Sequence, residues 1–253
     1  MNDSFSLQGK TALVTGGTRG IGRAIALRLA RAGAHVLANY VRDSVSAESL
    51  RQEAAAEKLS LEVVRADITG EKGLERLLAA MEPNYTPLSI FVHCAATGVH
   101  RPVEELTLRQ YDWTFSLNVR AFFELTHRLL PKFAPSASIV ALSSEGAVHA
   151  VPQYTLVGAS KGALESLVRH LAVELAPRGI RVNALSPGSI VTDAWKALPD
   201  AERRLAEAAH HSPSGRLITL AEVASAAHFL CSDAAAGIAG HTLVVDGGSR
   251  IRC

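Results

Sequence analysis

The sequence predicts one α/β domain built on a doubly wound, seven-stranded parallel sheet with helices on both faces. Its candidate strands are short, mainly apolar runs rich in β-branched residues, as expected of strands that helices cover on both sides. They alternate with longer segments of helical period, which is the pattern of βαβ units. The 253 residues, 48% of them apolar, suit a single large domain. The predicted strands are Thr11–Val14, His35–Asn39, Leu61–Ala66, Ser89–Cys94, Ser138–Leu142, Arg181–Ala184 and Thr242–Val245.

Three of the intervening segments carry the clearest helix signals. Gly20–Arg31 has an apolar face and is followed by Gly33, the residue type that helix C-termini prefer. Lys161–Ala176 has leucines at three- and four-residue steps and ends before a proline. A capping-box pattern opens 219–230 and predicts a third helix there.

Neither an internal repeat nor a low-complexity linker divides the sequence, so 1–253 is predicted to be one domain. The cofactor-binding half is expected at about 9–150, and the catalytic and substrate-binding half at about 151–253. Residues 186–215 are rich in proline and glycine around a polar helical piece. Because long irregular connections in compact domains are usually functional, this segment is predicted to cover the substrate as a lid.

Composition argues against several classes of protein. A net charge of +2 without a basic block favours neither nucleic acid nor an anionic membrane as a partner. The three cysteines have no metal-binding or CxxC spacing, so neither a metal site nor a disulfide framework is expected. The chain has no signal-peptide pattern at its start and no apolar run of about 18 residues. We therefore expect a cytoplasmic protein.

A glycine-rich loop follows the first strand and opens the first helix. Gly16, Gly20 and Gly22 allow a tight turn and a close approach of the backbone to a phosphate. The positive end of the helix dipole favours that charge. Between a strand and a helix, such a loop predicts a dinucleotide pyrophosphate site.

The end of the second strand indicates which dinucleotide binds. An acidic side chain near Tyr40 would accept hydrogen bonds from a ribose 2′-hydroxyl and repel a 2′-phosphate, but the sequence has none there. Arg19 and Arg42 are placed to hold a 2′-phosphate by charge-assisted hydrogen bonds. The sequence therefore favours NADPH, with Asp43 as the one nearby carboxylate that opposes it.

The middle of the chain carries a Tyr and a Lys at an unusual spacing. With the TGxxxGxG form of the glycine loop, Tyr154 and Lys161 make the chain resemble the short-chain dehydrogenase/reductase (SDR) family over essentially its whole length, which implies a Rossmann fold. In most of that family the catalytic Tyr lies four residues before the catalytic Lys. Here that position is Val157, and Tyr154 lies seven before. This spacing, with the runs 95–102 and 192–194, resembles the NADPH-dependent enoyl-acyl-carrier-protein reductases called type III.

The resemblance implies a set of site residues. Tyr154, Lys161, Ser144 and Asn118 match the catalytic positions. Trp113 and Trp195 are candidates for lining the acyl pocket, with core or interface packing as the alternative. The implied cofactor-binding residues are Gly16, Thr18, Arg19, Gly20, Ile21, Gly22, Tyr40, Arg42, Asp67, Ile68, Ala95, Ala96, Tyr154, Lys161, Pro187, Gly188, Ile190 and Thr192.

The displaced tyrosine bears on which bond is reduced. In a ketone, hydride and the reacting oxygen belong to the same carbon, whereas in an enoyl thioester hydride reaches C3 and charge develops on the C1 oxygen. A tyrosine hydroxyl that must reach the more remote C1 oxygen is expected at a different position from one that must reach a ketone oxygen. Seven residues are two helical turns within about 20°, so Tyr154 and Lys161 are expected on one face of a helix. The predicted activity is reduction of the C2–C3 double bond of a trans-2-enoyl thioester carried by acyl carrier protein or coenzyme A.

Two other functions stay open from the sequence. Asn118 and Ser144 are compatible with an SDR ketoreductase that acts on a 3-ketoacyl thioester or a secondary-metabolite ketone, and Val157 argues against it. The other alternative is a non-catalytic protein that senses NADP(H), against which the intact Lys161 argues. His93 stands where the family usually has Asn, and we expect it to be a structural substitute. The family resemblance also implies a homotetramer.

Overall fold

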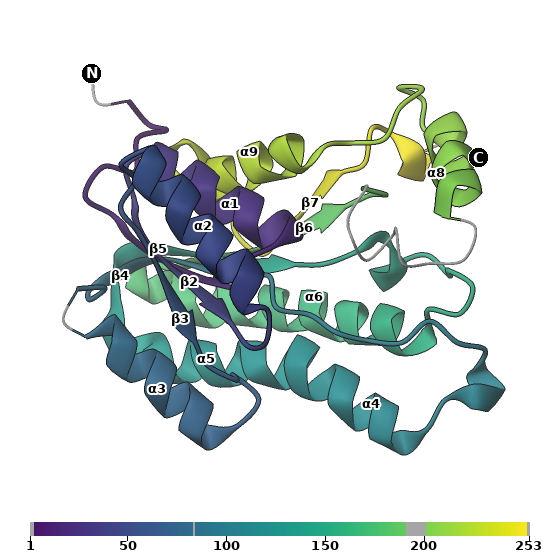
Figure 1. The fold of residues 1–253 in the computed structure, drawn as a ribbon, viewed down its shortest axis with the longest axis horizontal. Helices are drawn as coiled ribbons and strands as arrows, with labels where there is room; N and C mark the ends of the chain where they lie inside the picture. Colours follow the sequence, from purple (N-terminus) through teal and green to yellow (C-terminus); the bar gives the residue numbers. More distant parts are fainter. Residues whose placement is uncertain (1–2, 83, 191–200, 252–253) are drawn as a thin grey trace.

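The computed structural model describes residues 3–82, 84–190 and 201–251. Within these ranges, seven parallel strands form one sheet in the order β3-β2-β1-β4-β5-β6-β7 (Figure 1). The predicted doubly wound sheet is therefore confirmed. The strands are β1 Thr11–Thr15, β2 His35–Tyr40, β3 Leu61–Arg65, β4 Leu88–His93, β5 Phe133–Leu142, β6 Arg181–Pro187 and β7 Thr242–Val245.

Helices cover both faces of this sheet. Those formed by the described residues are α1 Gly20–Arg31, α2 Ser44–Ala56, α3 Glu71–Met81, α4 Leu108–Phe115, α5 Ala121–Leu129, α6 Thr155–Leu175, α8 Ala201–His211 and α9 Leu220–Cys231. Helices α1, α2 and α9 lie on one face, and α3, α4, α5 and α6 on the other (Figure 1). Each face has its own apolar core, because strand side chains alternate between the two sides.

The predicted helix boundaries hold at two of the three places. Helix α1 has the predicted bounds, and α9 begins after a capping box in which Thr219 Oγ1 accepts from the Glu222 N–H. Helix α6 begins at Thr155, six residues before the predicted start, and ends at Leu175. The early start matters because it places the first turn of α6 beside Tyr154.

The strand order reverses between β1 and β4, since the chain winds outward in one direction to β3 and in the other to β7. Open α/β sheets bind ligands at such a switch point, outside the carboxyl ends of the strands. The glycine loop after β1 lies against the segment after β4. A Cβ added to Gly16 would come within 3.0 Å of the Ala95 backbone.

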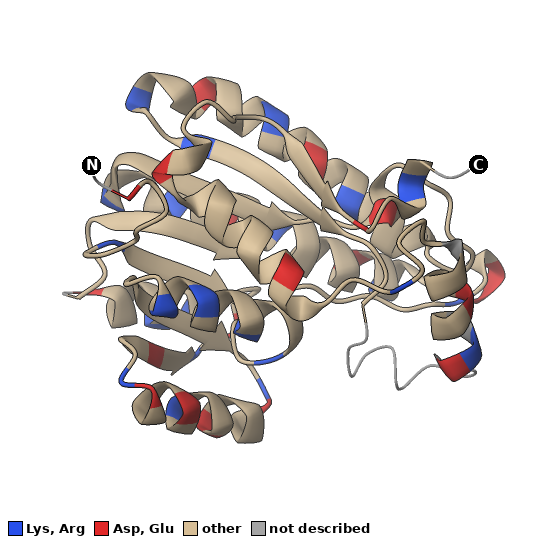
Figure 2. Cartoon of the chain, turned by 90° about the horizontal axis from the view of Figure 1, so that it is seen from above, with Lys and Arg blue, Asp and Glu red and all other residues tan. Residues whose placement is uncertain are grey.

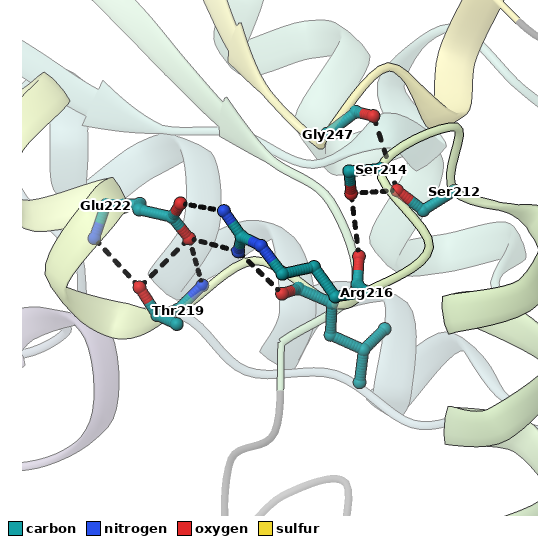
Figure 3. A network of polar contacts seen from close by, with 7 residues as sticks. Ser212, Ser214, Arg216, Thr219, Glu222 and Gly247 are labelled. Atoms are coloured by element: carbon teal, nitrogen blue, oxygen red, sulfur yellow. Dashed lines mark hydrogen bonds and ion pairs between the residues drawn. The ribbon is translucent and has the colours of Figure 1, made fainter.

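The segment 186–215 is described only in part. Residues 191–200, with Thr192 and Trp195 among them, lie outside the described residues, so the predicted lid remains a prediction. Beyond α8, the network in Figure 3 links the end of this segment to α9. Arg216 pairs with Glu222 at 2.6 Å, and Ser212 Oγ donates to the Gly247 carbonyl after β7.

Charge and hydropathy of the described residues add three observations. Cationic and anionic residues are both spread over the outer helices in the view of Figure 2. None of the helices in the described ranges combines the length and hydropathy that a membrane span requires. No group of three or more His, Cys, Asp or Glu side chains in this part of the chain is arranged to hold a metal ion.

Candidate active site

The glycine loop is shaped to receive a phosphate-bearing ligand. Gly16 and Gly20 have φ values of +62° and +53°, which side chains other than glycine rarely adopt. A Cβ on Gly22 would lie 2.1 Å from the Gly16 carbonyl oxygen, so α1 must approach the loop without a side chain there. A Cβ on Gly20 would meet nothing within 4 Å. The helix N-terminus thus opens onto free space, which fits a dinucleotide pyrophosphate.

The carboxylate that opposed NADPH is engaged elsewhere. Asp43 is the N-cap of α2, where it accepts from the Ser46 N–H at 2.9 Å and from Ser46 Oγ at 2.6 Å. These hydrogen bonds, and then the positive charge of Arg19, lower the pKa of Asp43. Arg19 and Arg42 are both exposed at this end of β2. This edge of the site therefore carries two exposed cations, and its carboxylate is held in a helix cap.

The other predicted cofactor residues gather at the same edge of the sheet. Asp67 follows β3 and accepts from the Thr69 N–H and hydroxyl, so it forms a turn and is not the cap of α3, which Gly70 provides. Asn39 ties β2 to β3 by donating to the Ala66 carbonyl. Thr18, Ile68 and Ile190 are buried, Ala95 and Pro187 are half-buried, and Gly188 lies against Asp246, whose Cβ would be 2.8 Å from an added methyl group.

Tyr154 does not lie on a helix, so the prediction that it shares a helical face with Lys161 is wrong. It is the N-cap residue of α6, with φ −114° and ψ 13°. Its hydroxyl donates to Ser144 Oγ at 3.3 Å, at the carboxyl end of β5. Its ring covers Gly146, where an added Cβ would meet Tyr154 Cδ1 and Cε1 at 2.5 Å. Burial raises the pKa of Tyr154, so the phenol keeps its proton at neutral pH.

Lys161 is buried beneath the same edge of the sheet. Its Nζ donates to the Leu142 carbonyl at 2.6 Å, and the side chain is 5% exposed. An ammonium has three donors, so this contact leaves capacity for a ligand hydroxyl. Burial lowers the pKa of Lys161 to about 8, and the carboxylate of Glu165 partly offsets this shift.

Asn118 lies in a π-helical turn, Ser116–Arg120, between α4 and α5. Its side chain accepts from the Thr97 N–H at 2.8 Å and donates to the Thr97 carbonyl and to Ser160 Oγ, both at 2.9 Å. It therefore joins the segment after β4 to the helix that carries Lys161. No hydrogen bond between Asn118 and Tyr154 is found in the described residues. The structure thus brings Tyr154 and Ser144 together, whereas Asn118 contacts Thr97 and Ser160.

His93 has the surroundings of a structural residue. It is 1% exposed, and its Nδ1 lies 3.0 Å from Thr15 Oγ1, which links β4 to β1. Burial, and then the positive charge of Lys161, lower the pKa of His93 to about 3. The ring is therefore neutral at physiological pH and carries no acidic proton to give. Burial also raises the pKa of the neighbouring Cys94 thiol, which argues against a nucleophile.

Three contacts at this site have no clear signal in the sequence. His100 lies edge-on to Tyr154, with ring centroids 5.1 Å apart, and the Arg101 N–H donates to the Gln153 carbonyl beside it. Val157, at the usual position of the family's tyrosine, packs against Gly98. Both His100 and Gly98 fall within the run 95–102 that resembles type III reductases, but no spacing rule connects them to residues 154 and 157.

Comparison with known proteins decides the family. A short-chain dehydrogenase/reductase from Pestalotiopsis microspora is 36% identical over 258 residues, which cover 97% of each protein. A family model described as Enoyl-(Acyl carrier protein) reductase matches residues 16–250. The chain belongs to the short-chain dehydrogenase/reductase family. Within that family, 1-cyclohexenylcarbonyl-CoA reductase from Streptomyces collinus is 35% identical, covering 96% of this chain and 87% of that protein.

Solved structures agree with this assignment. A structure from Beutenbergia cavernae with bound NADP has a TM-score of 0.91 and 36% identity, covering 98% of this chain and 100% of that chain. A gluconate 5-dehydrogenase from Burkholderia cenocepacia in complex with NADP and tartrate also has a TM-score of 0.91, at 27% identity, covering 99% of each chain. This SDR protein is an NADP-dependent oxidoreductase with a Rossmann fold, and the glycine cradle and exposed arginines described above fit that cofactor.

Proposed function

We propose that this SDR protein reduces the C2–C3 double bond of a trans-2-enoyl thioester with NADPH. The observation that carries the proposal is the pairing of Tyr154 with Ser144 at the carboxyl edge of the sheet, while Val157 fills the usual tyrosine position. Two comparisons support it. The matching family model is described as an enoyl reductase, and one relative reduces a CoA thioester according to its name.

The residues of this chain have distinct roles in such a reaction. When bound, NADPH would supply a hydride to C3 of the substrate and leave as NADP⁺, and a proton added at C2 would complete the saturated thioester. The Tyr154 hydroxyl then donates a hydrogen bond to the oxygen of the enolate that forms, a type of stabilisation that dominates many such steps. The raised pKa of Tyr154 keeps that proton available. Ser144 orients the phenol, since its Oγ accepts from the Tyr154 hydroxyl in the absence of substrate.

Lys161 and Asn118 support this pair. The buried ammonium of Lys161 is assigned to the nicotinamide ribose, and its positive charge favours developing negative charge nearby. Asn118 fixes the segment after β4 through the Thr97 backbone. In this proposal the substrate is an acyl thioester on acyl carrier protein or coenzyme A, and the protein works in the cytoplasm as a homotetramer.

A ketoreductase is the second candidate. Two observations support it. Ser144, whose Oγ accepts from the Tyr154 hydroxyl, is equally suited to bind the carbonyl oxygen of a ketone. The chain is also similar in structure to a gluconate 5-dehydrogenase. A non-catalytic NADP(H) sensor is the third, and the buried Lys161 next to the Tyr154 site argues against it because burying a cation is costly without a function.

One assay separates the three candidate functions. NADPH oxidation is followed at equal concentrations of crotonyl-CoA and acetoacetyl-CoA. The proposal expects turnover of crotonyl-CoA with formation of butyryl-CoA. Reduction of only the keto substrate would replace it with the ketoreductase, and tight NADPH binding without turnover of either would favour the sensor.

A further inference from the structure

A buried carboxylate lies one helical turn beyond Lys161 and has no role in the reaction proposed above. Glu165 is 6% exposed on α6, and its Oε1 accepts from Ser143 Oγ at 2.5 Å. Ser143 is 5% exposed and follows the last residue of β5. Buried carboxylates are rare unless they are paired. The position of this one beside the cofactor lysine therefore calls for an explanation.

Two consecutive residues at the end of β5 receive two side chains from α6. Lys161 Nζ donates to the Leu142 carbonyl at 2.6 Å, and Glu165 accepts from Ser143, the next residue. Lys161 and Glu165 are four residues apart and so lie on the same face of the helix. This arrangement fixes α6 to β5 just before Ser144, which holds the Tyr154 hydroxyl.

The charge of Lys161 depends on which groups face it. His93, the last residue of β4, and Cys94, which follows it, lie close enough to interact with Lys161 electrostatically, and Glu165 does so from the same helix. The pKa of His93 is lowered to about 3 and that of the Cys94 thiol is raised, so both groups are neutral near pH 7. Glu165 is the carboxylate of this set, and its Oε1 accepts from Ser143 Oγ. An opposite charge favours the protonated form of a lysine whose burial favours the neutral one.

We infer that Glu165, held by Ser143, is a positioning residue that keeps the Lys161 ammonium charged and directed at the end of β5. This inference rests on the role of Lys161 in binding the cofactor ribose, as proposed above. A purely structural tie between α6 and β5 needs no ionisable group, because apolar side chains of similar volume serve as well or better in a protein core. A carboxylate is needed where a neighbouring charge must be maintained.

The test is the pH dependence of NADPH binding to Glu165→Gln. The amide keeps an oxygen for Ser143 and removes the charge. NADPH affinity is measured by fluorescence titration from pH 7 to 10, above the titration of its 2′-phosphate at about 6. The wild-type protein is expected to lose affinity as the pH rises through about 8, the pKa of Lys161. In the variant this midpoint moves down by about one pH unit, so that binding at pH 8 is ~5-fold weaker.

Two matched variants identify the cause. Glu174→Gln changes an exposed residue of the same helix and leaves the midpoint in place. Ser143→Ala removes the hydrogen bond but leaves the charge, so its midpoint also stays near the wild-type value. If Glu165→Gln does not fold, the double variant Ser143→Ala/Glu165→Leu replaces both polar partners by apolar ones, which proteins tolerate better than a single unpaired group. It is expected to show the same downward shift.

The outcomes separate this inference from the proposed function. A midpoint that is unchanged in the folded Glu165 variants overturns the inference, and so does an equal shift in Ser143→Ala. Failure of the proposed role of Lys161 has another signature, since Lys161→Ala would then bind NADPH as tightly as the wild type at every pH. The substrate does not enter these measurements, so the identity of the reduced bond does not affect them.

Discussion

Val157 packs so closely on Gly98 that a methyl group at Gly98 would lie 2.1 Å from Val157 Cγ2. Val157 is 7% exposed in the first turns of α6, and Gly98 belongs to the segment after β4. The position that carries tyrosine in most relatives is thus filled by a short branched side chain under a backbone without a Cβ. The phenol that remains, on Tyr154, enters the site from the residue before the helix.

The contact predicts the effect of Gly98→Ala. Valine in a helix has one strongly preferred rotamer, so it cannot turn away from the new methyl group. We expect a loss of about 1–3 kcal/mol in the free energy of unfolding, as for other overpacked sites. Denaturant unfolding measures it, and the double variant Gly98→Ala/Val157→Ala should recover most of the loss. Gly162→Ala on α6 is the control, since its Cβ would meet only the Ala147 carbonyl at 3.4 Å. Equal effects of the two glycine substitutions would contradict the steric argument.

Replacing Tyr154 by Phe tests the proposed hydrogen-bond donor. The ring and its contacts with Gly146 and His100 remain, and only the hydroxyl is lost. We expect kcat with crotonyl-CoA to fall ~10²–10³-fold, as for loss of an oxyanion donor, with little change in NADPH affinity. Tyr111→Phe on α4, whose side chain is 44% exposed, serves as the control and should keep full activity. Full activity in the Tyr154 variant would remove this residue from the mechanism.

The arginines beside the Asp43 cap should determine the cofactor preference. Arg19→Ala and Arg42→Ala each remove a cation that is placed to hold the 2′-phosphate, so KM for NADPH should rise about tenfold while KM for NADH hardly changes. Steady-state kinetics with both dinucleotides measure this. Arg51→Ala changes an exposed arginine of α2 that pairs with Glu48, and it should leave both KM values as they are. An equal rise in KM for NADH would show that the arginines do not bind the 2′-phosphate, which NADH lacks.

Acid should weaken the network around Glu222 (Figure 3). Hydrogen bonds from Arg216, and then from Thr219, lower the pKa of Glu222 to about 2 from an ordinary value of 4.5. A lowered folded-state pKa adds stability above pH 4.5, and that stability is lost as the pH falls towards 2. Glu222→Gln should therefore lower Tm near pH 7, and the difference from wild type should shrink below pH 4. Glu48→Gln is the control. A Tm difference that persists undiminished near pH 2 would exclude the charge as its source.

The sheet could be predicted from the sequence because its strands are mainly apolar, β-branched runs that alternate with segments of helical period. The prediction missed the start of β5 at Phe133, where Pro135 and the exposed Ser136, with φ +63°, have the character of a turn. Pairing of Phe133 with Leu88 across an irregularity extends the strand there. Such an extension depends on the neighbouring strand, which local sequence does not reveal.

The start of helix α6, at the site itself, is a second boundary that local sequence does not reveal. Thr155, Val157 and Gly158 have low helix propensity, so local sequence gives no clear helix start before Lys161. Burial of Leu156 and Val157 outweighs that preference. The glycine loop and the residues Tyr154, Ser144 and Lys161 were identifiable because each follows a recognisable strand or repeats a family motif. The contacts of His100 and Glu165 were not, because they join segments that meet only in the folded chain.

The π-helical turn at Ser116–Arg120 contains one residue more per turn than the α-helices on either side of it. Each residue of an α-helix rotates the next by about 100°, and the wider π-helical turn absorbs its extra residue without passing that rotation on to α5, so deleting one residue here would give a regular helix with α5 in nearly the same orientation. The amide of Asn118 would no longer face Thr97. A chain one residue shorter would thus keep the packing of α5 and lose the contact that ties the segment after β4 to α6.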